Sequence, residues 1–461
     1  MTKPDTPEVS SRRELITPTS TKGPAIRLIG ERPQSLAGGP EPQFRTNACI
    51  AMTCLKEKSG EGTRLSRHAI DLTSLLRFIV LYVALYAAFG SASPFLPPFL
   101  SARGLGPEQI ALVLAAGTAI RLISAPIVGR LADLFGALRL ALSLCALAAS
   151  LAALGYLPSR GFALLLMVGV AHAAALAPLT PVSDALALGA AQGEAGQRGF
   201  EYGWVRGSGS AAFIVGSILA GYAVSARGIT IIPWFNAALL AGAGAAALFV
   251  PPLVRRPDRQ GSPEWRAEHI QTLVRIPAFR RVVLVAALIL GSHALHDGFA
   301  MIRWNQAGID PGFASLLWSE SVAAEVVVFF AIGPALLRRL GCAGAAMLAA
   351  AAGAVRWSVA ANTAAASALL FIQPLHGLTF ALLHLACLRV IAAIVPPGLE
   401  ATAQAIYGTV GIGGATVVLT LASGVLYEHF GAAGFWVMAA LCATAVPVAS
   451  LLPGRPPTNG C

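Results

Sequence analysis

Ionisable side chains lie inside the long apolar runs of this sequence, where they could bind a charged solute or carry protons. They are Arg121, His172, Asp184, Arg206, His293, His296, Asp297, Glu320, Glu325, Arg356, His376, His384 and Arg389. An ionisable group at the centre of a bilayer costs about 2.5–3.5 kcal/mol on insertion scales, so each one needs a partner or a water-filled cavity. The set predicts a polar pathway, because guanidinium groups bind carboxylates and because carboxylates and imidazoles exchange protons.

The elements that must carry these side chains are membrane-spanning helices. Of the 461 residues, 56% are hydrophobic and 12% are charged, whereas a soluble domain has about 25% charged residues. Apolar runs repeatedly exceed about 18 residues, the length that crosses a hydrocarbon core. We therefore predict an all-α, polytopic membrane protein with twelve transmembrane helices in two six-helix halves. The predicted spans are 75–100, 108–131, 137–157, 162–188, 202–225, 229–253, 281–304, 312–337, 342–361, 366–394, 402–426 and 432–452.

The segments between and around the spans define the predicted domains. These are a disordered cytosolic extension (1–70), a six-helix bundle (71–254), a cytosolic linker (255–280), a second six-helix bundle (281–453) and a cytosolic tail (454–461). The extension is rich in Pro, Ser, Thr, Gly and charges and has no sustained apolar period. Translation could start at Met1 or at Met52.

Arginines gather in the loops on one side of the predicted spans, above all in the linker. By the positive-inside rule, both termini are therefore expected in the cytosol. We expect a multi-pass protein of the cell inner membrane that acts as a monomer.

Several other functions are disfavoured. The net charge of +11 is not gathered in a basic domain interleaved with aromatic residues, so no nucleic acid partner is expected. The seven cysteines are scattered and no GxxxxGK[ST] run is present, which argues against a disulfide framework and a P-loop motor. His293 and His296 share a helical face but lack a clustered third ligand. We expect no metal, no cofactor and no enzyme activity.

Two opposite charges are predicted to face each other. Asp184 and Arg206 each lie about five residues from the inner end of their predicted spans, or roughly 8 Å deep at 1.5 Å per residue. This spacing predicts an Asp184–Arg206 pair across a cavity. The pair could contact substrate, or it could be a structural ion pair that ties two helices together.

The loop after the second span reads GRLADLFGALR from Gly129 to Arg139, and a similar loop, GPALLRRLG, follows the eighth span. The first loop resembles the G-x-L-a-D motif of the major facilitator superfamily. That resemblance implies a fold of two related halves around a central cavity that opens alternately to each side. It also implies that Gly129, Asp133 and Arg139 belong to a conformational gate.

Other segments resemble the lactose permease and its relatives. FEYGWVRGSGSAAFI, from Phe200 to Ile214, is similar to the segment that carries their substrate-binding arginine. The resemblance implies that Arg206 and Asp184 contact substrate, and that Glu325, His376 and Arg356 form the proton-coupling site. Three positions depart from that family, and they make lactose itself an improbable substrate. They are Thr379, Gln373 and Phe213, where the family has a glutamate, a lysine and a tryptophan.

A more specific resemblance, to the 3-phenylpropionate transporter group, runs over nearly all of residues 75–452. It rests mainly on SHALHDGFAMIRWNQAG (292–308), LLWSESVAAEVVVFF (316–330) and LHGLTFALLHLACLRVI (375–391). It implies uptake of a small aromatic acid together with a proton. Arg121, Arg206 and Arg356 could then bind the carboxylate, and Phe213, Phe299 and Trp304 could face the ring.

The predicted function is proton-coupled symport of a small organic solute, such as an aromatic carboxylate, by alternating access. The expected partners are the small-molecule substrate, protons and the lipid bilayer. The alternatives left open are export of drugs or metabolites by proton antiport, symport of a sugar or nucleoside with protons, transport without proton coupling, and a non-transporting scaffold. Glu320 is assigned no role.

Overall fold

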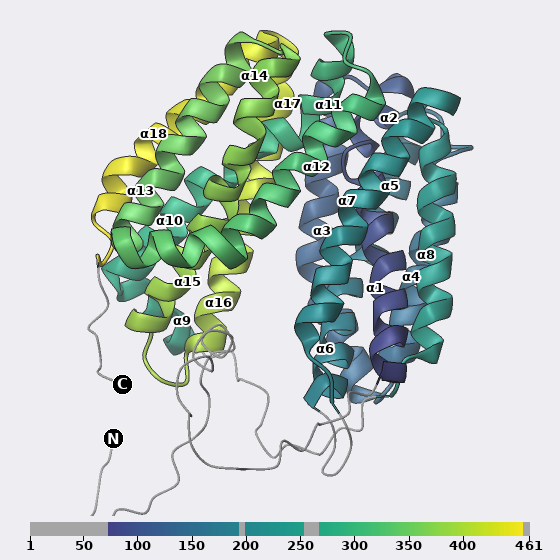
Figure 1. The fold of residues 1–461 in the computed structure, drawn as a ribbon, viewed down its shortest axis with the longest axis horizontal. Helices are drawn as coiled ribbons and strands as arrows, with labels where there is room; N and C mark the ends of the chain where they lie inside the picture. The colour runs from purple at the N-terminus through teal and green to yellow at the C-terminus, as the bar shows by residue number, and fades with distance from the viewer. Residues whose placement is uncertain (1–71, 193–198, 253–266, 455–461) are drawn as a thin grey trace, which may run out of the picture. The chain divides into compact units, whose positions relative to one another are not determined.

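The computed structural model describes residues 72–192, 199–252 and 267–454, and every regular element within these ranges is a helix (Figure 1). The predicted extension, the choice between Met1 and Met52, and residues 455–461 of the predicted tail lie outside the described residues. The same holds for the first part of the predicted linker. The all-α class predicted from composition is confirmed.

The first half of the described chain contains helices α1 to α8. They are α1 (Leu72–Ala92), α2 (Leu96–Ala102), α3 (Pro107–Leu134), α4 (Leu138–Gly155), α5 (Phe162–Leu176), α6 (Leu179–Gln192), α7 (Tyr202–Arg227) and α8 (Ile231–Phe249). α1 packs along α7, and α4 packs along α8. Their buried faces are mainly Ala, Leu and Gly, the small and apolar residues that allow close helix packing in membranes.

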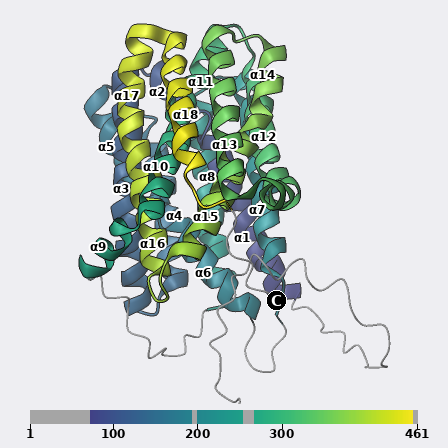
Figure 2. The same ribbon diagram turned by 90° about the vertical axis from the view of Figure 1, so that its left-hand side faces the viewer.

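The second half contains α9 to α18 and several tighter or wider helical turns. The α-helices are α9 (Ala267–Arg275), α10 (Pro277–Gly291), α11 (Ala294–Gln306), α12 (Pro311–Val327), α13 (Gly333–Asn362), α14 (Ala366–Ile372), α15 (Leu383–Ile394), α16 (Glu400–Ile406), α17 (Ala415–Phe430) and α18 (Phe435–Ser450). α13 and α18 run side by side in Figures 1 and 2. α9 lies within the predicted linker, and α10 begins four residues before the predicted start of the second bundle at 281.

Ten helical segments of the described chain are long and apolar enough to cross a membrane. Two of them are 52 and 51 residues long, which is roughly 75 Å at 1.5 Å per residue and more than twice a hydrocarbon core. Each reverses direction at a glycine with positive φ, Gly341 (φ 69°) and Gly431 (φ 53°). Counting two crossings for each long segment gives twelve spans, as predicted.

Several spans are interrupted where hydropathy alone predicts continuous helices. α1 ends before Pro94 and α2 resumes with Pro97 in its first turn, where a proline leaves no helical hydrogen bond unmade. α5 and α6 are separated at Ala177–Pro178, and α10 and α11 at Ser292–His293. π-helical turns occupy Val328–Ile332, Leu378–Leu382 and Tyr407–Gly414. Such interruptions change the direction in which side chains point, compared with a straight helix.

The two halves touch through α7 with α12 and through α3 with α17. Glycines permit both contacts: a Cβ added to Gly221 would lie 2.2 Å from Ser315 Oγ, and one added to Gly424 would lie 2.5 Å from Ala111 Cβ. These helix pairs bring the cavity-facing sides of the halves together.

Candidate functional site: a cavity between the two halves

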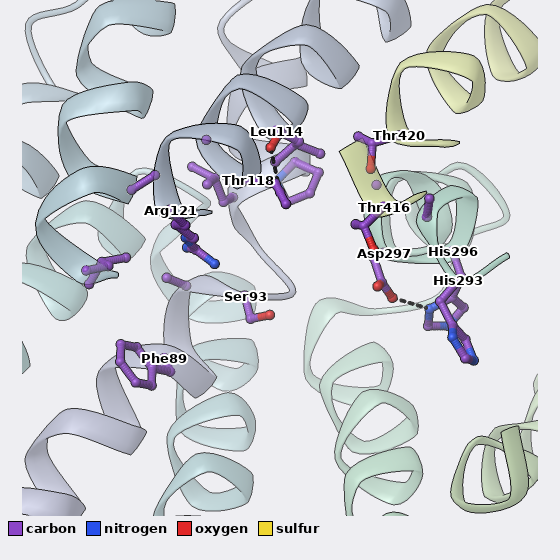
Figure 3. Close-up of a pocket in the computed structure, with 18 of the residues that line it drawn as sticks. Phe89, Ser93, Leu114, Thr118, Arg121, His293, His296, Asp297, Thr416 and Thr420 are labelled. Carbon is purple, nitrogen blue, oxygen red and sulfur yellow. Dashed lines mark hydrogen bonds and ion pairs between the residues drawn. The ribbon is translucent and has the colours of Figure 1, made fainter. Parts of the chain in front are cut away.

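A cavity of about 690 Å³ is lined by side chains from both halves (Figure 3). The first half contributes residues of α1, α3, α5 and α7, and the second half contributes residues of α10, α11, α12 and α17. Its aromatic wall includes Phe89, Phe213, Trp318 and Phe380. The volume lies within the range of roughly 300–1,000 Å³ that is typical of small-molecule sites.

Arg121 on α3 is the guanidinium that lines this cavity, and its side chain points toward the second half (Figure 3). No hydrogen bond or ion pair within the described part of the chain engages it. A charged guanidinium with no partner among the described residues can bind a carboxylate with charge-assisted hydrogen bonds. The predicted residue Phe213 lines the same cavity.

Asp297 on α11 presents a carboxylate to the cavity from the second half (Figure 3). Its side chain is 58% exposed, and its Oδ1 lies 3.2 Å from Nδ1 of His296. Asp297 lies in the first turn of α11, where the partial positive charge of a helix N-terminus stabilises an anion. The cavity therefore contains a cation from one half and a carboxylate from the other.

A buried polar network lies behind Asp297. Arg356 is fully buried, and its Nη1 lies 3.1 Å from His376 Nδ1. Its Nη2 lies 3.5 Å from His296 Nε2 and 3.2 Å from Gln373 Oε1. The guanidinium also stacks over the Trp357 ring at 4.5 Å. Arg356 is thus held by neutral partners inside the second half and does not line the cavity.

The network continues to Glu325 on α12. His376 Nε2 lies 3.6 Å from Glu325 Oε2. An arginine can only donate hydrogen bonds, so His376 Nδ1 accepts from Arg356 and its Nε2–H points to Glu325. By the same argument His296 Nε2 accepts from Arg356 and its Nδ1–H points to Asp297. One arginine therefore lies between two histidine–carboxylate pairs, and the structure brings Glu325, His376 and Arg356 together.

The predicted pair of Asp184 and Arg206 forms, with 3.7 Å between Arg206 Nη1 and Asp184 Oδ1. The same oxygen accepts hydrogen bonds from the hydroxyl groups of Tyr82 at 2.5 Å and Tyr202 at 2.8 Å. Arg206 also donates to the Tyr86 hydroxyl and lies over the Tyr86 ring. Neither charged residue is among those that line the cavity.

The decisive comparison is with known families. The model of the MFS_1 like family matches residues 75–438. The chain belongs to this family.

The most informative relatives of this transporter are bacterial. It is 33% identical over 372 residues to the probable 3-phenylpropionic acid transporter of Escherichia coli, with 78% of this chain and 92% of the relative covered. It is 25% identical over 391 residues to the maltose permease of Geobacillus stearothermophilus, with 83% and 95% covered. The resemblance to the 3-phenylpropionate transporter group is confirmed.

Solved structures show the same fold at low sequence identity. The nucleoside transporter NupG matches with a TM-score of 0.68 at 16% identity, covering 82% of this chain and 98% of that one. The POT family transporter PepTSo matches with a TM-score of 0.61 at 14% identity, covering 82% and 97%. The predicted fold, two six-helix halves of the major facilitator type, is confirmed.

The residues of the predicted gate lie at the end of α3 and the start of α4. Gly129 is near the C-terminus of that helix, and Asp133 and Arg139 line a small pocket of about 150 Å³ between α3 and α4. Arg139 donates from Nη1 to the Val250 carbonyl at 3.3 Å, which ties the start of α4 to the end of α8. Their role in gating stays a prediction.

Asp297, His296 and Trp318 are among the residues that line this transporter's cavity but are absent from the predicted site. All three line the cavity, and the rings of His296 and Trp318 stack 5.1 Å apart. Asp297 and His296 were recognisable as ionisable residues inside an apolar run. The direction in which their side chains point could not be recognised from the sequence, because it depends on the break between α10 and α11. Conversely Phe299 and Trp304, predicted to face a ring, are buried within the second half.

Proposed function

We propose that this transporter carries out proton-coupled uptake of a small aromatic carboxylate through the cavity between its halves. The observation that supports this best is Arg121, a guanidinium with no hydrogen-bond or ion-pair partner among the described residues, in a cavity with an aromatic wall. The name of the relative at 33% identity supports an aromatic acid. The nucleoside and maltose transporters are more distant, at 16% and 25% identity.

The substrate carboxylate binds to Arg121, and its ring packs against Phe213 and Trp318. A guanidinium pairs with both oxygens of a carboxylate, which fixes the position of the acid group. Aromatic side chains favour offset or edge contacts with a ring. Arg206, Asp184 and Arg356 lie outside the cavity lining, so their predicted contact with substrate requires a different conformation of the transporter.

Glu325, His376 and Arg356 couple transport to protons. Glu325 is half-buried and contacts His376, and His376 accepts from Arg356. A change in the relative position of the halves alters the surroundings of Glu325, because α12, which carries it, packs against α7 of the first half. A carboxylate whose charged neighbours change with conformation binds a proton in one state and releases it in the other.

Alternating access supplies the conformational change. Gly129, Asp133 and Arg139 form the gate at the arginine-rich end. We propose that the protein acts as a monomer in the cell inner membrane. Both termini lie in the cytosol, because arginine-rich loops favour the inner side of a membrane. Protons then move inward down their gradient together with substrate.

The test measures accumulation of labelled 3-phenylpropionate by right-side-out membrane vesicles with an acidic exterior. Wild-type protein should accumulate the label, and a protonophore should abolish the accumulation. Arg121→Gln should weaken binding roughly 10- to 150-fold, because a hydrogen bond to a charged group is worth about 1.5–3 kcal/mol. Arg121→Lys should retain part of the affinity because it keeps the charge.

Arg103→Gln is the matched control, since Arg103 follows α2 and does not line the cavity. It should transport like wild type. Unchanged binding in Arg121→Gln would contradict the carboxylate site. Accumulation that survives the protonophore would contradict proton coupling, and proton-driven exclusion of the label would identify an exporter.

A further inference from the structure

Asp297 differs from Arg356 and Glu325 of the second half because it lines the cavity, where substrate can reach it. Its carboxylate is 58% exposed and lines the cavity, whereas Arg356 is fully buried and Glu325 does not line the cavity. It hydrogen-bonds to His296 on its own helix. On the opposite wall lies Arg121, the group that binds the substrate carboxylate in the proposed function (Figure 3).

The groups around Asp297 can be named for each neighbouring element. α11 contributes His293 and His296, α3 contributes Arg121 across the cavity, and the buried network contributes Arg356 and His376. α17 faces the cavity with Thr416 and Thr420, which do not titrate in water. α12 faces it with Trp318, Ser321 and Val322, and the segment before α2 with Ser93. None of the described lining residues other than Asp297 carries a carboxylate.

A carboxylate substrate therefore brings a second negative charge into a cavity that already contains one. Arg121 can neutralise one of the two charges. Arg356 lies behind His296 and is shared with the Glu325–His376 pair. Like charges in a cavity of low dielectric constant favour protonation of one carboxylate. The substrate acid is held by the guanidinium, so Asp297 is the group that takes the proton.

We propose that Asp297 is the proton-binding residue that couples to substrate occupancy, so that a proton enters Asp297 whenever a carboxylate occupies the cavity. The proton comes from water as substrate enters, and it returns to water when substrate leaves on the other side. Asp297 then responds to substrate occupancy, whereas Glu325, which does not line the cavity, keeps its role in the proposed function as the carboxylate whose proton affinity changes with conformation. This inference rests on the proposed function, and it identifies the carboxylate that becomes protonated when the acid substrate binds.

The closing experiment measures binding of 3-phenylpropionate to the purified full-length protein by calorimetry. Measurements in buffers of different ionisation enthalpy give the number of protons taken up per ligand. Wild type should take up about one proton at alkaline pH, and its Kd should rise up to about tenfold per pH unit. Asp297→Asn should take up none, should show a Kd that changes little with pH, and should bind more tightly than wild type at alkaline pH.

Glu325→Gln and Asp297→Glu are the matched variants. Glu325→Gln should retain proton uptake on binding, and Asp297→Glu should restore it. Proton uptake that disappears in Glu325→Gln and persists in Asp297→Asn would overturn the inference and leave the proposed function intact. Absence of 3-phenylpropionate binding to wild type would instead remove the proposed function, and the inference with it.

The amine-bearing acid phenylalanine tests the other use of a cavity carboxylate. If Asp297 bound a substrate ammonium group, phenylalanine would bind more tightly than 3-phenylpropionate, and Asp297→Asn would abolish that preference. This result would overturn the inference. Weaker binding of both ligands to Asp297→Asn at alkaline pH would also overturn it, because Asp297 would then serve to position Arg121.

Discussion

Three arginines in apolar surroundings have different partners, and the partners decide what each can do. Arg206 has a carboxylate and a tyrosine hydroxyl. Arg356 has two imidazoles and an amide. Arg121 has no ion-pair or hydrogen-bond partner among the described residues and lines the cavity. The residue type is the same in all three cases, but Arg121 is the arginine that offers free hydrogen-bond donors to a solute.

Asp184 gives a test of this distinction. Asp184→Asn removes the charge that faces Arg206 while keeping an oxygen for Tyr82 and Tyr202. We expect a loss of about 1–2 kcal/mol of stability, since the pair is partly exposed, and an unchanged Kd for 3-phenylpropionate. Thermal unfolding in detergent and a binding titration measure the two effects. Lost binding at unchanged stability would instead support the direct substrate contact predicted from sequence.

The sequence predicted some of these relations and not others. The Asp184–Arg206 pair followed from equal depth in adjacent spans, and the grouping of Glu325, His376 and Arg356 followed from the family resemblance. Which arginine lines the cavity could not be predicted, because side-chain direction depends on helix rotation. Asp297 was visible as a charge in an apolar run. Its exposure to the cavity depends on the helix break just before it.

At the scale of elements, the contact between α1 and α7 depends on glycines. A Cβ added to Gly216 would lie 2.5 Å from the Ala87 carbonyl oxygen, and one added to Gly90 would lie 2.1 Å from the Phe213 carbonyl oxygen. Backbone atoms cannot rotate away as side chains can. The two helices therefore approach each other as closely as glycine permits, and this contact positions Phe213 in the cavity wall.

Two glycines on α7 form a matched pair for a stability measurement. Gly216→Ala forces the backbones of α1 and α7 apart, and we expect a loss of about 1–3 kcal/mol from overpacking. Gly207→Ala meets no atom within 4 Å, and it should be neutral or gain up to about 1 kcal/mol from helix propensity. Thermal unfolding of both variants in detergent compares them. Equal stability of the two would show that the close approach does not matter.

Hydropathy predicted the spans well, but it could not predict their interruptions. A window of about 19 residues averages over a break or a π-helical turn, and no charge marks the wide turns at Val328–Ile332 or Leu378–Leu382. Pro94 and Pro178 lie at two of the breaks. No proline accompanies the break at Ser292–His293, the one that starts α11 in the middle of its span and places Asp297 in a first turn.

At the scale of the whole transporter, described contacts between the halves join the ends of helices that the predicted topology places outside. Ser225 at the end of α7 donates to Asp310 Oδ2 at 3.0 Å, and the Gly312 amide donates to the same oxygen at 2.8 Å. Asp310 is also the N-cap of α12. One carboxylate thus caps a helix and links the two halves, so it stabilises the conformation in which these ends are closed.

The variants Ser225→Ala and Asp310→Ala distinguish the two roles of Asp310, which are the contact between the halves and the N-cap of α12. Ser225→Ala removes two hydrogen bonds between the halves, the one that Ser225 donates to Asp310 and the one that it accepts from the Gly312 amide. Each is worth about 0.5–1.5 kcal/mol, so opening at this end should become at least roughly 2- to 10-fold more frequent. Asp310→Ala also removes the cap and should lower the melting temperature further.

The readout is the rate at which an impermeant maleimide, added outside, labels a cysteine introduced by Thr420→Cys. Thr420 is a buried cavity position, and the same protein with Thr420 intact is the control. Faster labelling in both variants supports a link between the halves. Faster labelling in Asp310→Ala without any change in Ser225→Ala would mean that Asp310 serves α12 only, and that closure depends on the glycine contacts at Gly221 and Gly424.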